Sequence, residues 1–233
     1  YFRNDAQQLL AQPQAYDGIN DFVKSTNESL SPFYYCMAMH TAPHAYQLLI
    51  DIGGGSSDVM GFEAGTPQFI SSFNFAGNDL YLYKSHTKAN IVRKCINTLC
   101  DKLKDSMKKS VFTDTIRISN GENLSSLMNY GFQKFPADFN LIWTNPKLRF
   151  MLKFHAAAIL YQTAQLCKAN KDEIPAYVHM TGNGSKLFRI LHDDERRKLV
   201  NGIFAAVFDA ADVNIQVSDV RNPKFAAAQG CLY

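Results

Sequence analysis

The stretch DIGGGSSD, residues 51–58, places three glycines and two serines between two aspartates, directly after an apolar run at 46–50. The apolar run predicts a buried strand. An ordinary turn needs one or two glycines, so three in a row predict a backbone that approaches a ligand and presents N–H groups to it. Such N–H groups bind phosphate oxygens, and Asp51 would hold a hydrated Mg²⁺ beside them. A structural turn with solvated aspartates is the alternative.

The composition is that of an ordinary globular protein. The chain has 233 residues, of which 46% are hydrophobic and 19% charged, and its formal net charge is +3. A chain of this length buries roughly 70% of its unfolded surface, so its core needs no disulfide or metal. The small net charge gives no support to nucleic-acid binding. Because no apolar run approaches 18 residues, we expect no membrane span.

The cysteines show neither a metal-binding nor a redox spacing, because no two of them form a C-x-x-C pair. They are Cys36, Cys95, Cys100, Cys167 and Cys231. Free thiols in a reducing compartment are therefore expected, which favours the cytoplasm.

The hydrophobic pattern predicts five strands. Those at 46–52, 58–63 and 67–75 are joined by tight turns and form an antiparallel meander, and two more follow at 176–181 and 214–217. Helices are expected at 4–26, at 88–110, at 148–170, after Lys186 and after Pro223, with a short strand at 115–119. A further helix is expected to start at Pro32, with Ser31 as its cap, and to run through Met39 and stop before Pro43.

A second glycine loop, Gly182-Asn-Gly-Ser-Lys186, lies between a predicted strand and a predicted helix. This is the position of loops that bind phosphate or nucleosides, although the spacing is neither that of a P-loop nor G-x-G-x-x-G. A simple strand-to-helix turn explains it about as well. The stretch FAGND at 75–79 indicates only a turn.

Other chemistry finds little support. His40 and His44 are four residues apart, but Pro43 breaks the helix that would align them into a metal site. His155 lies on the apolar face of its predicted helix and is expected to be a core residue. No serine lies on a recognisable nucleophile elbow, so hydrolase chemistry of that kind is not indicated.

Taken in order, these motifs resemble the actin-like ATPase superfamily, which includes actin, heat-shock chaperone ATPases, bacterial cell-division and plasmid-segregation proteins, and sugar kinases. The stretch at 48–62 is similar to the phosphate loop of the second lobe in that family. The stretches at 27–35, 75–81, 180–187 and 222–233 resemble its first connecting helix, its G-G-x-D segment, its adenosine loop and its second connecting helix. Chaperone-type and bacterial cell-division members look most similar.

The resemblance implies an α/β, ribonuclease-H-like lobe with a mixed five-stranded sheet flanked by helices. Residues 43–83 and 148–233 would form its core, with an inserted subdomain at about 84–147. Residues 1–42 would be N-terminal helices that include the first connecting helix. Nothing upstream of Glu28 resembles the phosphate hairpin of the first lobe. We therefore expect this chain to be the second lobe of a longer protein, with Gly53 and Gly182 at the same end of the sheet.

The resemblance also implies site residues. Asp51 and Glu28 would be catalytic, with Asp51 holding Mg²⁺ through water. The cofactor, ATP or ADP, would contact three groups of residues. Its phosphates would bind Gly53, Gly54, Gly55, Ser56 and Ser57, Gly77 would be a further cofactor contact, and its nucleoside would bind Gly182, Gly184, Ser185 and Lys186. Lys102 and Lys104 would be further adenosine contacts, as in chaperone-type members. Asn78 and Leu30 depart from the family pattern, so the subfamily stays open.

The expected function is therefore the Mg-nucleotide-binding lobe of an actin-like or chaperone-like ATPase. Hydrolysis is expected only when the first lobe is joined, and this chain alone is expected to bind Mg-ATP weakly. Two alternatives stay open, a non-catalytic nucleotide switch or filament scaffold, and a small-molecule kinase or polyphosphate hydrolase. The expected partners are the nucleotide, the first lobe and other copies in a filament.

Overall fold

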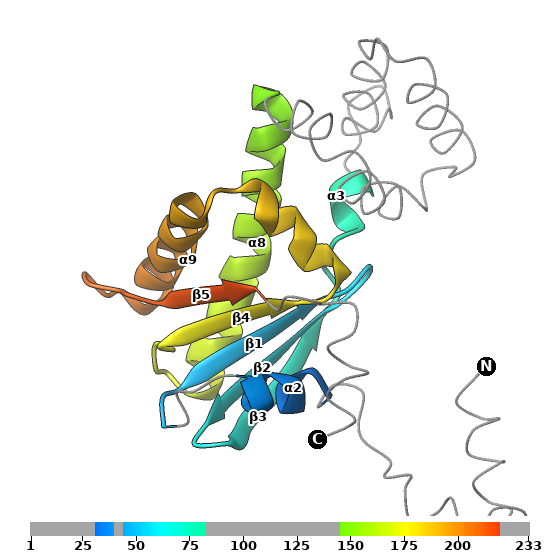
Figure 1. Ribbon diagram of the computed structural model, residues 1–233. Helices are drawn as coiled ribbons and strands as arrows, with labels where there is room; N and C mark the ends of the chain where they lie inside the picture. The colour runs from blue at the N-terminus through cyan, green and yellow to red at the C-terminus, as the bar shows by residue number, and fades with distance from the viewer. Residues whose placement is uncertain (1–30, 40–43, 83–144, 220–233) are drawn as a thin grey trace, which may run out of the picture.

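A mixed five-stranded sheet forms the centre of the computed structural model, which describes residues 31–39, 44–82 and 145–219 (Figure 1). Its strands are β1 (Gln47–Ile52), β2 (Ser57–Glu63), β3 (Thr66–Phe73), β4 (Tyr177–Thr181) and β5 (Gln216–Asp219), in the order β3-β2-β1-β4-β5. The first three strands are antiparallel neighbours, whereas β4 is parallel to β1 and β5 is parallel to β4. This topology confirms the predicted ribonuclease-H-like lobe.

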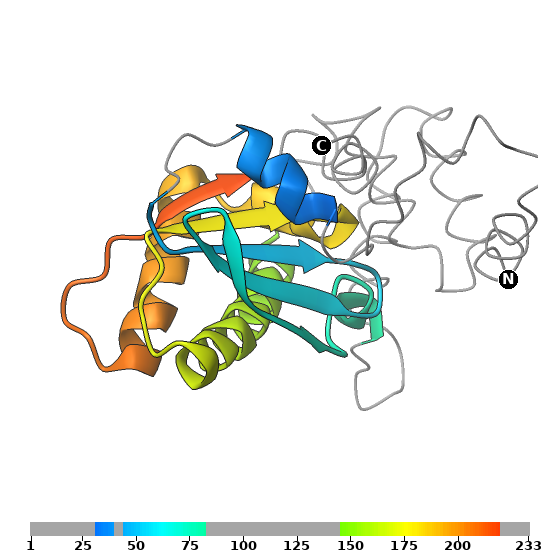
Figure 2. The ribbon, with the colours of Figure 1, turned by 90° about the horizontal axis from the view of Figure 1, so that it is seen from below.

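Helices cover both faces of the sheet. The long helix α8 (Pro146–Asn170) and helix α9 (Asp193–Phe208) lie on one face, and α2 (Ser31–Met39) lies on the other (Figure 2). Two short elements flank the sheet, α3 (Asp79–Leu82) and the 3₁₀ helix η2 (Asn183–Ile190). Helix α8 begins at Pro146 because the Asn145 side chain accepts the backbone N–H groups of Lys147 and Leu148.

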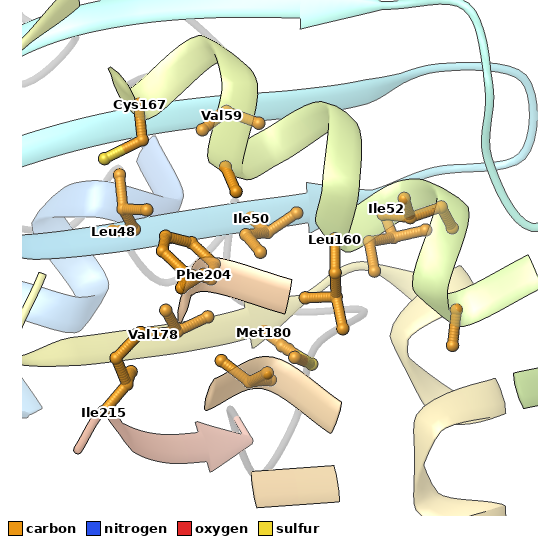
Figure 3. Close-up of a cluster of buried hydrophobic side chains, with 14 of the residues drawn as sticks. Leu48, Ile50, Ile52, Val59, Leu160, Cys167, Val178, Met180, Phe204 and Ile215 are labelled. Carbon is orange, nitrogen blue, oxygen red and sulfur yellow. The ribbon is translucent and has the colours of Figure 1, made fainter. Parts of the chain in front are cut away.

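Strand β1 is buried along most of its length because helices cover both faces of the sheet. Leu48, Ile50 and Ile52 belong to the larger core beneath α8 and α9, together with Val178 and Phe204 (Figure 3). The alternate residue Leu49 joins Met60 and Phe62 of β2 in a smaller core against α2. The run at 46–50 was predicted as a buried strand from its apolar sequence, and its burial is confirmed.

Strand β5 differs most from the sequence prediction, because it begins at Gln216 rather than at residue 214. The Ile215 N–H donates to the Asn201 side chain of α9, at 2.9 Å, and the Ile215 side chain is fully buried. Pairing with β4 therefore starts one residue later, where the Gln216 N–H donates to the Ala176 carbonyl. The helix expected after Lys186 is also divided, into η2 and then α9, which starts after a capping box between His192 and Glu195.

The predictions for helices 4–26 and 88–110, the strand 115–119, the helix after Pro223 and the subdomain at about 84–147 lie outside the described residues. The division of the chain into segments therefore stays a prediction. Within the described residues, Cys36 and Cys167 are free and buried. None of the helices described is both long enough and apolar enough to cross a membrane.

Candidate functional site

The loop between β1 and β2 is a short turn with an exposed tip. The Gly53 N–H donates to the Ser56 carbonyl at 2.9 Å, which closes the turn. Gly54, Gly55 and Ser56 are exposed. A Cβ atom on Gly55 would meet nothing within 4 Å, so the tip is open to a ligand.

A second segment, the turn between β3 and α3, holds this loop through backbone hydrogen bonds. The Gly77 N–H donates to the Gly53 carbonyl at 3.1 Å, and the Asn78 N–H donates to the Gly54 carbonyl at 2.8 Å. A third bond runs in the opposite direction, because the buried Ser57 hydroxyl donates to the Phe75 carbonyl at 2.8 Å. Ser57, predicted as a phosphate ligand, thus uses its hydroxyl to fix the loop.

The third segment, the turn from β4 into η2, packs directly against the same loop. A Cβ atom on Gly184 would lie 2.5 Å from the Ile52 Cγ2 atom and 2.9 Å from the Gly53 carbonyl oxygen. A Cβ atom on Gly77 would lie 3.1 Å from the Gly184 Cα atom. Only glycine permits this approach. The three predicted loops therefore meet at one end of the sheet, and Gly53 and Gly182 lie at that same end.

Two aspartates mark the ends of the loop. Asp51 of β1 pairs in register with Asp58 of β2, so both side chains lie on the sheet face that α2 covers. Directly opposite residues have Cβ atoms about 4.5–5.5 Å apart, and like charges there repel. A divalent cation would offset this repulsion. Mg²⁺ commonly takes one or two carboxylates and completes its shell with water and phosphate oxygens.

Asp51 lies between the backbone of the turn at 182–186 and the buried thiol of Cys36. On one side its carboxylate lies against Gly182, where an added Cβ atom would overlap the Asp51 Oδ1 atom. On the other side, Cys36 of α2 is buried close enough for Asp51 to act on its thiol. Burial, together with the Asp51 charge, raises the pKa of the Cys36 thiol to about 12. Cys36 is therefore a neutral packing residue at neutral pH.

The turn at 182–186, from β4 into η2, is closed by a hydrogen bond within it. Gly182 has φ 78° and ψ 164° and directly precedes η2. The Ser185 side chain is buried, and its hydroxyl donates to the Gly182 carbonyl at 2.8 Å. Lys186, which follows it, is half-buried.

The structure thus brings together most of the site residues predicted from the sequence. The residues that converge are Asp51, Gly53, Gly54, Gly55, Ser56, Ser57, Gly77, Gly182, Gly184, Ser185 and Lys186. Glu28, Lys102 and Lys104 lie outside the described residues, so their roles stay predictions. In the described ranges no group of three or more histidine, cysteine or acidic residues could hold a metal alone, so a cation here would need phosphate oxygens and water.

Sequence reasoning missed Asp58 and Asn78 as site residues. The spacing between Asp51 and Asp58 contained a usable signal, because a four-residue loop at 53–56 pairs them across the hairpin. The Asn78 Nδ2 atom lies 2.8 Å from the position of a Cβ atom on Gly54. The Asn78 Oδ1 atom is buried without a hydrogen-bond partner among the described residues. An unsatisfied acceptor beside the loop fits a ligand hydroxyl or a hydrated cation.

The predicted burial of His155 is confirmed, since its side chain is only 1% exposed. Its Nε2 atom lies 2.9 Å from the Ala76 carbonyl oxygen, in the turn that holds the loop. Burial lowers the pKa of His155, and this effect outweighs the Ala76 hydrogen bond and the attraction of Asp79, which both act to raise it. His155 is therefore neutral at neutral pH.

Acid should consequently destabilise the fold through His155. Below pH of about 6.5 the unfolded chain binds a proton at this residue that the folded chain does not bind until its lower pKa is reached. In that window the free energy of unfolding should fall by up to about 1.4 kcal/mol per pH unit from this group. Urea denaturation at several pH values would measure the slope, and His155→Gln should reduce it. Equal slopes in the two proteins would contradict the assignment.

Neither a protein-family model nor a curated protein sequence matches the chain. Its fold is similar to several solved structures. A structure of the PilM–PilN complex of type IV pilus biogenesis shares 15% identity, with a TM-score of 0.41 and coverage of 88% of this chain and 50% of that one. The archaeal actin homologue Ta0583 shares 12%, with a TM-score of 0.46 and coverage of 88% and 54%.

A third structure is the activator of 2-hydroxyisocaproyl-CoA dehydratase from Clostridium difficile, which was solved with bound ADPNP. It shares 13% identity, with a TM-score of 0.41 and coverage of 87% of this chain and 63% of that one. The chain spans about half the length of the first two solved structures and somewhat more of the third.

Proposed function

We propose that this chain is a nucleotide-binding lobe that holds the phosphates of Mg-ATP or Mg-ADP at the loop between β1 and β2. The observation that carries the proposal is the meeting of three glycine-containing turns beside Asp51. Their close backbone packing leaves the tip at 54–56 exposed and free of bulky side chains. Phosphate oxygens can approach such a backbone and accept its N–H groups.

Each part of the site has a role under this proposal. The exposed tip binds the β- and γ-phosphates, and Asp51 and Asp58 bind waters of the Mg²⁺ ion. The turn at 182–186 contacts ribose and adenine. Because the loop is held by the turn at 75–78, its donors are already oriented before the nucleotide arrives, which is the form of stabilisation that phosphoryl transfer relies on.

Hydrolysis is proposed only for a longer protein in which a first lobe completes the site, with Glu28 ordering water near the metal. A single lobe lacks about half of the phosphate contacts. A charge-assisted hydrogen bond contributes roughly 1.5–3 kcal/mol, and about 1.4 kcal/mol is a factor of ten in affinity. Losing even three such bonds moves a micromolar site to millimolar affinity or weaker.

The proposal is tested by titrating Mg-ATP and Mg-ADP at millimolar concentration into the ¹⁵N-labelled chain. We expect saturable shifts of the amide signals at 53–57 and 184–185, with weaker binding when EDTA removes Mg²⁺, and no phosphate release above background. Asp212→Asn, an exposed carboxylate change before β5, should leave the affinity unchanged. Absence of shifts at both loops would refute the proposal, whereas low-micromolar affinity or steady turnover by this chain alone would refute the need for a first lobe.

A second function, an interaction module that associates with copies of itself, is favoured by one feature of α8. Phe150, Phe154 and Tyr161 are 70%, 59% and 52% exposed, and their spacing places them along one side of the helix. Large apolar side chains gathered on a surface are typical of contact sites. Sedimentation of the chain with and without Mg-ATP tests this alternative. A monomer under both conditions, at concentrations where nucleotide binds, would exclude it for this chain.

A further inference from the structure

The His155 side chain contacts the turn at 75–78, which holds the loop of the proposed phosphate site. It projects from α8 into the interior, where its Nε2 atom is 2.9 Å from the Ala76 carbonyl oxygen. The ring also packs against Phe75, with 4.7 Å between ring centroids. A backbone carbonyl can only accept a hydrogen bond, so the Nε2 atom carries the proton and donates it. This fixes the tautomer of a buried, neutral histidine.

The turn that His155 contacts has its N–H groups aimed at the loop. Ala76 presents its carbonyl to α8, while the next two residues, Gly77 and Asn78, donate to the Gly53 and Gly54 carbonyls. The two sets of bonds are adjacent along one short stretch of backbone. A shift of the Ala76 peptide therefore moves the donors that determine the path of the phosphate loop.

Asp79 is the other group that shapes this turn. Its carboxylate accepts the Ala76 N–H at 2.6 Å, and its own N–H donates to the Ala76 carbonyl at 3.1 Å. These bonds close the turn internally, but they do not attach it to the helix layer. The hydrogen bond between the His155 Nε2 atom and the Ala76 carbonyl joins the turn to α8.

We propose that His155 is a positioning residue for the phosphate loop, acting through the Ala76 carbonyl and the Gly77 and Asn78 N–H groups. It touches no ligand itself. Its hydrogen bond fixes the distance between the turn and α8, and the turn then holds the loop at Gly53 and Gly54. The consequence for nucleotide affinity rests on the function proposed above, whereas the effect on the loop does not.

Hydrogen exchange tests the positioning role without any nucleotide. In His155→Leu, which keeps an apolar side chain but removes the donor, we expect the Gly77 and Asn78 amides to exchange about tenfold faster, equivalent to about 1.4 kcal/mol of local opening. The amide of Ile50, in the middle of β1, reports on global unfolding and should change less. His155→Gln places a side-chain N–H near the same position and should restore slow exchange at Gly77 and Asn78.

A matched control lies on the same helix. Thr163 of α8 is fully buried, and its hydroxyl has no hydrogen-bond partner among the described residues. Thr163→Val keeps the shape and should leave exchange at Gly77 and Asn78 as in the unaltered chain. If His155→Leu left these amides unchanged, or accelerated them only in parallel with Ile50, the positioning role would be overturned.

A measurement on the unaltered chain covers the case in which His155→Leu fails to fold. The ¹⁵N shifts of the His155 imidazole should show a protonated Nε2 and an unprotonated Nδ1 at neutral pH, and the opposite tautomer would overturn the proposal. In the nucleotide titration, His155→Leu should bind Mg-ATP several-fold more weakly, with His155→Gln close to the original affinity. If the unaltered chain gave no shifts with Mg-ATP, the proposed function would fail, while the exchange result would still decide the role of His155.

Discussion

Replacing Gly182 by alanine should destabilise this protein more than a glycine-to-alanine change in any other loop that the structure describes. We expect Gly182→Ala to lower the free energy of unfolding by about 3 kcal/mol or more, because two costs add. With φ 78° and ψ 164°, the residue occupies a backbone region that is essentially restricted to glycine. The new Cβ atom would also overlap the Asp51 Oδ1 atom and the Ile52 carbonyl oxygen, and backbone cannot move aside as a flexible side chain can.

The matched control is Gly202→Ala in α9. A Cβ atom on Gly202 meets nothing within 4 Å, and alanine is the better helix former. We therefore expect this change to raise the free energy of unfolding by about 0.5–1 kcal/mol. Urea denaturation at neutral pH would measure both variants. A Gly182→Ala protein as stable as the original would mean that the turn at 182–186 has a different backbone path.

Replacing Asp51 by asparagine should have the largest effect on ligand binding. The change removes the charge that would orient water on Mg²⁺ but keeps the size of the side chain. We expect Mg²⁺ to lose its ability to strengthen ATP binding, so that affinities with Mg²⁺ and with EDTA become equal. In a longer protein with both lobes, Asp51→Ala should likewise abolish hydrolysis while leaving the fold intact.

The stability of the ligand-free chain distinguishes a metal-binding role of Asp51 from a role in stabilising its own turn. Because Asp51 lies opposite Asp58, removing one charge relieves repulsion, and Asp51→Asn should unfold at the same or a slightly higher urea concentration. Asp212→Asn, with the same change in net charge, should retain the Mg²⁺ effect. If Asp51→Asn kept the Mg²⁺ effect, Asp51 would not belong to the metal site. If it unfolded the chain, Asp51 would instead be a structural residue of its turn.

The fold was predictable because its signals are local. The apolar run at 46–50, the glycines that follow it and the short spacing of the next two strands specify an antiparallel meander without any tertiary information. The start of β5 was not predictable to the residue. It depends on the bond between Ile215 and Asn201, which are 14 residues apart and come together only after α9 has packed.

In the candidate site, too, the loops could be predicted from local sequence, whereas the contacts between distant residues could not. Glycine loops after strands indicate where a ligand approaches backbone, and the loops at 53–57 and 182–186 were found on that signal. The family resemblance placed Ser57 at the phosphates, and sequence spacing does not reveal that the Phe75 carbonyl lies within reach of its hydroxyl. His155 contacts Ala76 from 79 residues away, so its pattern within α8 could predict burial but not the hydrogen bond.

Two of the hydrogen bonds that join the β1–β2 loop to the turn at 75–78 are made by main-chain atoms alone, Gly77 to Gly53 and Asn78 to Gly54. Every amino acid except proline offers the same donor and acceptor. The geometry of this loop is therefore insensitive to which side chains stand at most neighbouring positions, so long as glycine is kept where the chains touch. Two proteins could share this backbone arrangement with few identical residues, and a comparison of their sequences would then detect little similarity.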